Sequence, residues 1–153
     1  MRVITVRQPW AWAIIQGQKD VENRTRNIAG AYRGPVAIHA GLSTDTSSLS
    51  AKFTYGAWLR WWKETRKAGV DVGQQRGAII GVVDLTDVHP DCTELVEPYG
   101  HTPTCTPWAM SGHWHLCLAN ARPLARPIPW RGALGLRTVP ADIEAAIREQ
   151  VTV

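Results

Sequence analysis

Three charged side chains that follow a short predicted helix have the types and spacing to act together on a ligand. They are Lys19, Glu22 and Arg24. Glu22 and Arg24 are two residues apart, so in an extended segment they face the same side. A lysine and an arginine beside an acid can bind a phosphate or the edge of a base, with the arginine as a planar fork. Alternatively, neighbouring cations can depress the pKa of the lysine, so that it serves as a base or nucleophile. From spacing alone, a surface ion pair near a helix end is the simpler interpretation.

Histidines and cysteines in the second half of the chain form a second group with possible chemistry. They are His89, Cys92, His101, Cys105, His113, His115 and Cys117. One His-x2-Cys and one His-x3-Cys pair have spacing similar to that of zinc ligands, but no Cys-x2-Cys pair is present. The last three of the group alternate along one predicted strand. We therefore predict reduced thiols, ordinary histidines and no metal site.

Signatures of other chemistries are missing from the sequence. Ser111 precedes Gly112, but the G-x-S-x-G turn of a nucleophilic serine is absent. Phosphate-binding loops and dinucleotide fingerprints are absent too, so we expect no bound cofactor.

Length and composition place the chain among globular proteins. Its 153 residues suit a single domain over 1–153, with 44% hydrophobic and 20% charged residues. No apolar run approaches the roughly 20 residues of a membrane span, and we expect no membrane partner. The sequence begins directly with a strand-like run, without a signal core, which together with three cysteines predicts a reducing, cytoplasmic location.

Charge is distributed unevenly along the chain. Residues 1–33 carry six of the 17 lysines and arginines, whereas residues 77–121 carry none and hold five acids. A positive face of this kind favours an anionic partner such as single-stranded RNA, DNA or a nucleotide. The eight tryptophans are more than a core of this size needs, which leaves candidates for stacking on bases.

Hydrophobic periodicity and turn residues divide the chain into strands and helices. We predict strands over 2–6, 35–40, 77–88, 113–119 and 132–139, and helices over 9–16, 58–67 and 140–150. Residues 20–26 alternate loosely, 89–112 form a long loop, and the prolines of 122–129 indicate an edge or connector. Five or so strands, mostly antiparallel, with three helices indicate an α+β barrel-like domain.

The order of short motifs resembles one known family. The run Gln8-Pro9-Trp10-Ala11, then Gly17, Lys19 and Glu22-Asn23-Arg24, followed by residues 33–40, is similar to the ASCH domain. Later segments resemble it more weakly, at 81–85, 107–109, 113–116 and 127–136. The resemblance covers most of the chain, and the first motif carries most of its specificity.

This resemblance implies a PUA-like β-barrel of about five or six mixed, mostly antiparallel strands flanked by about three helices. It implies binding of RNA or nucleotides in a cleft beside the Gly-x-Lys-x-x-Glu-x-Arg segment, with a modified or flipped base between aromatic walls. The ligand-binding residues it implies are Trp12, Lys19, Glu22, Arg24, Arg26, His39 and Trp108.

The resemblance also implies two alternatives to binding alone. Some members are amidohydrolases on acetylated cytidine that use a lysine, a threonine and a glutamate. Lys19 matches that lysine, Glu22 stands at the threonine position, and Glu94 and Glu97 are candidates for the glutamate. Ribonuclease activity, also associated with the fold, keeps Ser111 beside Lys19 and Glu22 as a candidate catalytic residue. The other alternative is a module that binds a protein partner without chemistry.

Overall fold

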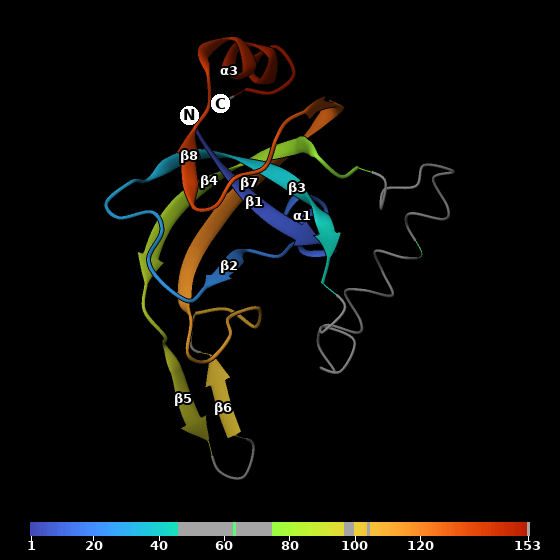
Figure 1. Cartoon of the computed structure of the whole chain (residues 1–153). Helices are drawn as coiled ribbons and strands as arrows, with labels where there is room; N and C mark the ends of the chain where they lie inside the picture. The colour runs from blue at the N-terminus through green and yellow to red at the C-terminus, as the bar shows by residue number, and fades with distance from the viewer. Residues whose placement is uncertain (46–62, 64–74, 97–99, 104, 153) are drawn as a thin grey trace.

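A six-stranded sheet and a separate hairpin form the β-structure of the computed structural model, which describes residues 1–45, 63, 75–96, 100–103 and 105–152. The sheet has the strand order β2-β7-β4-β3-β1-β8, and β5 pairs with β6 in the hairpin (Figure 1). The strands are β1 (Arg2–Gln8), β2 (Val21–Arg24), β3 (Gly34–Thr44), β4 (Ala78–His89), β5 (Thr93–Val96), β6 (Gly100–Pro103), β7 (Trp114–Pro129) and β8 (Leu136–Thr138). The helices are α1 (Trp10–Ile15) and α3 (Ala141–Arg148).

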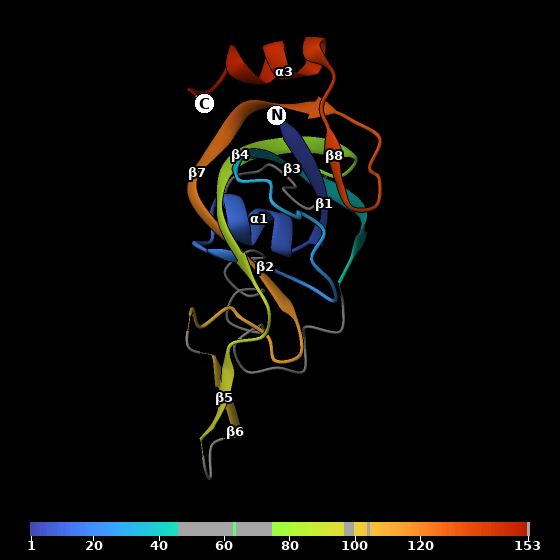
Figure 2. The same ribbon diagram turned by 90° about the vertical axis from the view of Figure 1, so that its left-hand side faces the viewer.

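The sheet is mixed and open. β1 and β3 run parallel, and the other neighbours run antiparallel, as predicted. The predicted closed barrel is wrong, because the edge strands β2 and β8 are short and do not pair with each other. The long strands β4 and β7 nevertheless curve strongly, and Figure 2 shows α1 lying inside that curve.

Both faces of the sheet are buried, each under a different helix. Residues of β3 and β4 alternate between the two sides, as a period of two requires. Val36 and Ile38 pack on the α1 side with Ile14 and Ile15, while Ala37 packs on the other side with Ile147 of α3. This two-sided burial explains why residues 77–88 form an almost continuous apolar run.

The turn after α1 places the polar residues that follow it. Gln8 Oε1 accepts a hydrogen bond from the Trp12 N–H at 3.1 Å, which caps the start of the helix. At the other end, a Cβ on Gly17 would lie 2.8 Å from Ala13 Cα, so only glycine fits there. The left-handed residue is Gln18 (φ 62°) rather than Gly17, and the Lys19 N–H then bonds to the Ala13 carbonyl at 2.9 Å. The chain therefore turns straight from α1 into β2.

Several predicted elements differ from those observed. The predicted loop over 89–112 contains the β5–β6 hairpin, whose four-residue strands are too short to show a period. Residues 122–129 belong to β7 and pair with β4 only, so their prolines lie on a half of the strand without a second neighbour among the described residues. Of the three predicted helices, two are present, and the helix over 58–67 lies outside the described residues except for Lys63.

Within the described part of the chain, no helix has the length and apolar character needed to cross a bilayer.

Candidate ligand-binding cleft

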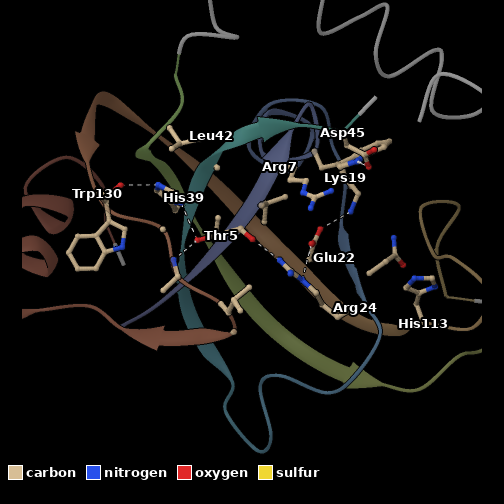
Figure 3. A pocket seen from close by; sticks show the side chains of 18 of the residues that line it. Thr5, Arg7, Lys19, Glu22, Arg24, His39, Leu42, Asp45, His113 and Trp130 are labelled. Carbon is tan, nitrogen blue, oxygen red and sulfur yellow. Dashed lines mark hydrogen bonds and ion pairs between the residues drawn. The ribbon is translucent and has the colours of Figure 1, made fainter. Parts of the chain in front are cut away.

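A cleft of about 1470 Å³ opens beside the carboxyl ends of the parallel strands β1 and β3. Four parts of the chain supply much of its lining: the end of β1 with Trp10, the segment from Lys19 to Arg24, the loop around Trp108, and the loop between β7 and β8. Figure 3 shows Lys19, Glu22 and Arg24 on one side of this cleft, with His39 and Trp130 at the other end. The site therefore combines residues from both ends of the chain.

Lys19, Glu22 and Arg24 form a connected charge cluster on the wall of the cleft. Glu22 lies at the centre, with its Oε2 3.4 Å from Lys19 Nζ and its Oε1 3.1 Å from Arg24 Nε. Lys19 Nζ also donates to the Val21 carbonyl, and Arg24 Nη2 donates to the Thr5 carbonyl at 2.7 Å. Lys19 and Glu22 are buried, while Arg24 is partly exposed. The three side chains therefore hold one another in place on the cleft wall, and they do not form an isolated surface ion pair.

Burial changes the acid–base character of Lys19. Loss of hydration lowers the pKa of Lys19 below its ordinary value, and the nearby Arg24 cation lowers it further, while Glu22 opposes both effects. The neutral amine is therefore more accessible than on an ordinary surface lysine. Such a group can donate a hydrogen bond to a ligand or act as a base.

Two tryptophans flank the charge cluster. The rings of Trp10 and Trp108 meet edge to face, with centroids 6.5 Å apart. Trp10 is fixed by its Nε1–H, which donates to Asp45 Oδ2 at 2.8 Å, and Lys19 Nζ lies 5.9 Å from the Trp10 ring centre. The Trp108 carbonyl accepts a bond from Asn23 Nδ2 at 2.9 Å, which ties its loop to β2. Planar apolar surface thus stands directly beside polar groups.

The far end of the cleft contains a chain of neutral hydrogen bonds. His39 Nε2 lies 3.0 Å from the Trp130 carbonyl, and its Nδ1 lies 3.1 Å from Thr5 Oγ1. Thr5 Oγ1 also accepts the Ala133 N–H at 3.2 Å. These partners fit a neutral ring that donates from Nε2 and accepts at Nδ1. Burial lowers the pKa of His39, which agrees with a neutral ring.

The cleft is positive overall. Its lining includes the cations Arg7, Lys19, Arg24 and Arg131 and the two carboxylates Glu22 and Asp45. The concave shape focuses this field and attracts an anionic ligand.

The predicted site residues divide into two groups. The structure brings Lys19, Glu22, Arg24, His39 and Trp108 together in the cleft. It places three others elsewhere: Trp12 is buried in the core beside Ala13, Arg26 is exposed beyond the end of β2, and Ser111 is exposed with its Oγ 3.4 Å from Asp91 Oδ2. Glu94 is exposed on the β5–β6 hairpin and does not line the cleft, and Glu97 lies outside the described residues.

Sequence reasoning missed five lining residues that could contact a ligand. They are Arg7, Trp10, Asp45, Trp130 and Arg131. Arg7 precedes the first motif, Trp10 lies within it, and Arg131 belongs to the closing run, so position in or beside the motifs was an available signal. Asp45 carried no signal, because only the fold brings it to Trp10.

The side chains that could hold a metal do not line the cleft. Among the described residues, His89, Cys92, Cys105 and His115 offer ligand atoms within 4.8 Å of one another, and Asp87, His89 and Cys117 form a second group that shares His89. All three cysteines of the chain are in the thiol form.

Comparisons with known proteins identify the family and the fold. None of the curated proteins matches this sequence. The fold is similar to the crystal structure of ASCH from Zymomonas mobilis, with a TM-score of 0.54 and 16% identity over 97% of this chain and 93% of that one. A tyrosine-to-phenylalanine variant of that protein gives the same TM-score and identity over 97% and 96% of the two chains. The model of the ASCH domain matches residues 4–127, which is most of the sequence. The chain therefore belongs to the ASCH domain family.

Proposed function

We propose that this chain binds single-stranded RNA through the cleft, with one base held beside Trp10 and Trp108. The family is generally RNA-binding. The observation that carries the proposal is the Lys19–Glu22–Arg24 cluster, with Lys19 and Glu22 buried, beside two aromatic rings in a positive cleft. Each part matches one component of a nucleotide: rings for the base plane, hydrogen-bonding groups for its edge, and cations for phosphate.

The polar cluster suits the edge of a base. Glu22 is an acceptor that can receive an exocyclic amino group, and Lys19 and Arg24 are donors for ring nitrogens or carbonyl oxygens. Because these groups already hold one another in place, a bound base meets a preorganised set of partners. Arg7 and Arg131 stand on other parts of the lining, where they can meet the phosphates.

The size of the cleft leaves room for more than an unmodified base. A volume of about 1470 Å³ exceeds the ≈ 300–1,000 Å³ of typical small-molecule sites. The space suits a nucleotide together with a neighbour on the strand, or a base that carries an added group.

Binding of a fluorescently labelled, unstructured RNA oligonucleotide tests this proposal by anisotropy. We expect saturable binding that weakens when Arg131 is replaced by alanine or when Trp108 is replaced by alanine. Arg126→Ala is the matched control, because Arg126 is exposed and does not line the cleft. A DNA oligonucleotide of the same sequence shows whether the 2′-hydroxyl contributes. Equal loss in all three variants, or no binding by the unaltered protein, would refute the proposal and leave a protein partner as the alternative.

A second function, hydrolysis of a nucleic-acid ligand in the same cleft, is favoured by one observation. Lys19 is buried, lines the cleft and has a lowered pKa, which are the properties of a lysine base or nucleophile. Glu22 lies within reach to exchange a proton with it. Release of acetate from an acetylated cytidine, or cleavage of the RNA, is the measurement. Turnover that disappears in Lys19→Ala supports catalysis, whereas turnover that survives this substitution excludes Lys19 as the catalytic group.

A further inference from the structure

We propose that His89, Cys92, Cys105 and His115 bind a structural zinc ion outside the cleft. The four side chains each offer a ligand atom, and these atoms lie within 4.8 Å of one another. Two thiolates and two imidazoles are a typical ligand set of structural zinc. The sequence alone favoured ordinary thiols and histidines here, so the structure changes the interpretation of this group.

Strand pairing brings the four residues together. His89 ends β4 and lies directly opposite His115 of β7, and their rings meet edge to face with centroids 5.1 Å apart. Cys92 precedes β5 and Cys105 follows β6, and the pairing of Thr93 with Pro103 closes the hairpin at this point. The base of the hairpin therefore places both thiols beside both imidazoles.

The distances fit tetrahedral coordination. Cys92 Sγ and Cys105 Sγ lie 3.4 Å and 3.6 Å from the same atom, His115 Nδ1. With Zn–S of about 2.3 Å and Zn–N of about 2.0 Å, tetrahedral geometry separates a sulfur from a nitrogen by roughly 3.6 Å.

Each imidazole has one ring nitrogen next to a backbone carbonyl, which leaves the other nitrogen to bind zinc. His115 Nε2 lies 2.9 Å from the Met110 carbonyl, so this nitrogen donates its proton and Nδ1 keeps its lone pair. His89 Nδ1 lies 2.8 Å from the Pro90 carbonyl, which leaves Nε2 as the ligand atom. A backbone carbonyl that fixes the tautomer of a ligating histidine is a recurrent feature of metal sites.

Charge and coordination number indicate zinc held for structure. Two thiolates neutralise the charge of Zn²⁺, and binding displaces one proton from each thiol. Four protein ligands leave no open position for water, as in closed structural sites. The neighbouring group of Asp87, His89 and Cys117 offers only three ligands, and its carboxylate is already paired with Arg33 at 3.3 Å.

The proposed zinc would also support one wall of the cleft. Cys105 and His115 bracket the loop that carries Trp108 and Met110. The Met110 carbonyl contacts His115 Nε2. The Met110 N–H donates to Oδ1 of Asn23, a residue of β2, at 3.0 Å. The metal would therefore fix the ends of the loop that presents Trp108 to the ligand.

Metal content and cobalt spectroscopy test the zinc proposal without relying on RNA binding. Protein purified under reducing conditions and reconstituted with Zn²⁺ should retain about one zinc ion per chain after dialysis, measured by elemental analysis. Cobalt-loaded protein should show the intense visible bands of a tetrahedral Co²⁺ ion. It should also show the charge-transfer absorption of cobalt-bound thiolate. Cys92→Ser with Cys105→Ser should remove both signals. Cys117→Ser is the matched control and should keep them.

Several outcomes would overturn the proposal. Unaltered protein that binds neither metal under reducing conditions would do so, as would a Cys92–Cys105 disulfide in its place. Retention of the cobalt bands in the double serine variant, or their loss in Cys117→Ser, would assign the metal to other residues. The cobalt spectrum of the unaltered protein tests metal binding without any substitution, so this test does not depend on whether a variant folds.

Discussion

At the scale of single residues, the wall of the cleft contains a buried lysine whose charge is costly to bury. Burying the Lys19 ammonium costs hydration free energy, and Glu22 offsets part of the cost through its contact at 3.4 Å. Glu22 serves Arg24 at the same time, so the two cations depend on one carboxylate. Substitution of the central Glu22 should therefore have a different effect from substitution of Lys19.

We predict that Glu22→Gln destabilises the fold more than Lys19→Met. Removing the carboxylate leaves two neighbouring cations without their counter-charge, which costs about 3 kcal/mol for a buried pair. Lys19→Met removes the buried charge, keeps the Glu22–Arg24 pair and fills a similar volume, so the unfolding free energy should change by less than about 1 kcal/mol. Urea unfolding measures both. RNA binding should fall in both variants, and a Lys19→Met protein that binds RNA normally would remove Lys19 from the ligand site.

The neutral state of His39 should appear in the pH dependence of stability. In the unfolded chain the ring protonates near its ordinary pKa of 6.5, and burial places the folded pKa below that value. Between the two values the unfolded chain binds more protons, so the free energy of unfolding falls as the pH falls below 6.5. His39→Gln should lessen this slope. Urea unfolding of both proteins at a series of pH values measures it, and equal slopes would show that His39 does not contribute.

At the scale of elements, the position of α1 depends on the absence of a side chain in β4. A Cβ on Gly81 would lie 2.5 Å from Ile15 Cδ1 and 2.8 Å from the Arg122 carbonyl. Both α1 and β7 therefore lie close to β4 at Gly81. This close approach fixes the end of α1, from which Lys19 enters the cleft.

We predict that Gly81→Ala destabilises the protein by about 1 to 3 kcal/mol, as overpacking of a filled core does. Ile15→Val removes the atom that clashes and alone should cost about 1 kcal/mol. The double variant should lose less stability than the two single losses combined, because the shortened side chain on α1 leaves room for the new methyl group. Thermal unfolding of the unaltered protein, the two single variants and the double variant measures these losses as a double-mutant cycle. Additive losses would show that the Arg122 carbonyl, and not Ile15, sets the limit.

Elements with strong local signals were predictable from the sequence, whereas their partners were not. The β-branched and apolar runs of β1, β3 and β4 and the turn at Gly17 identify themselves. Nothing local shows that β2 pairs with the start of β7 or that the sheet stays open, because a period of two reveals a buried face and not a neighbour. The short β5–β6 hairpin was missed because its four-residue strands are too short to show a period.

The candidate site was predictable to a similar degree. Lys19, Glu22 and Arg24 were identified together because they are close in sequence. Trp12 was expected to line the cleft, but residues two apart on a helix point to nearly opposite sides. Trp10 reaches the cleft, and Trp12 enters the core. Arg26 stays away because β2 ends at Arg24.

At the scale of the whole molecule, the cleft is lined by segments that are far apart in the sequence. β1 supplies Thr5 and Arg7, and the loop before β8 supplies Trp130 and Arg131. β8 pairs with β1, so this loop is held against the residues it must face. Arg131 and Trp108 lie on separate segments of the lining, which allows their contributions to binding to be measured separately.

We predict that salt separates the two contributions to RNA affinity. Each phosphate contacted by a cation gives a slope of about −0.7 in a plot of log affinity against log salt for a single strand. Arg131→Ala should therefore reduce the magnitude of the slope by about 0.7. Trp108→Ala should lose about 1 to 3 kcal/mol of binding free energy at every salt concentration, with an unchanged slope, because stacking releases no counterions. Anisotropy titrations across a salt series measure both quantities. Should Trp108→Ala change the slope as Arg131→Ala does, the ring would be supporting the phosphate contacts, and stacking on a base would no longer explain its place in the cleft.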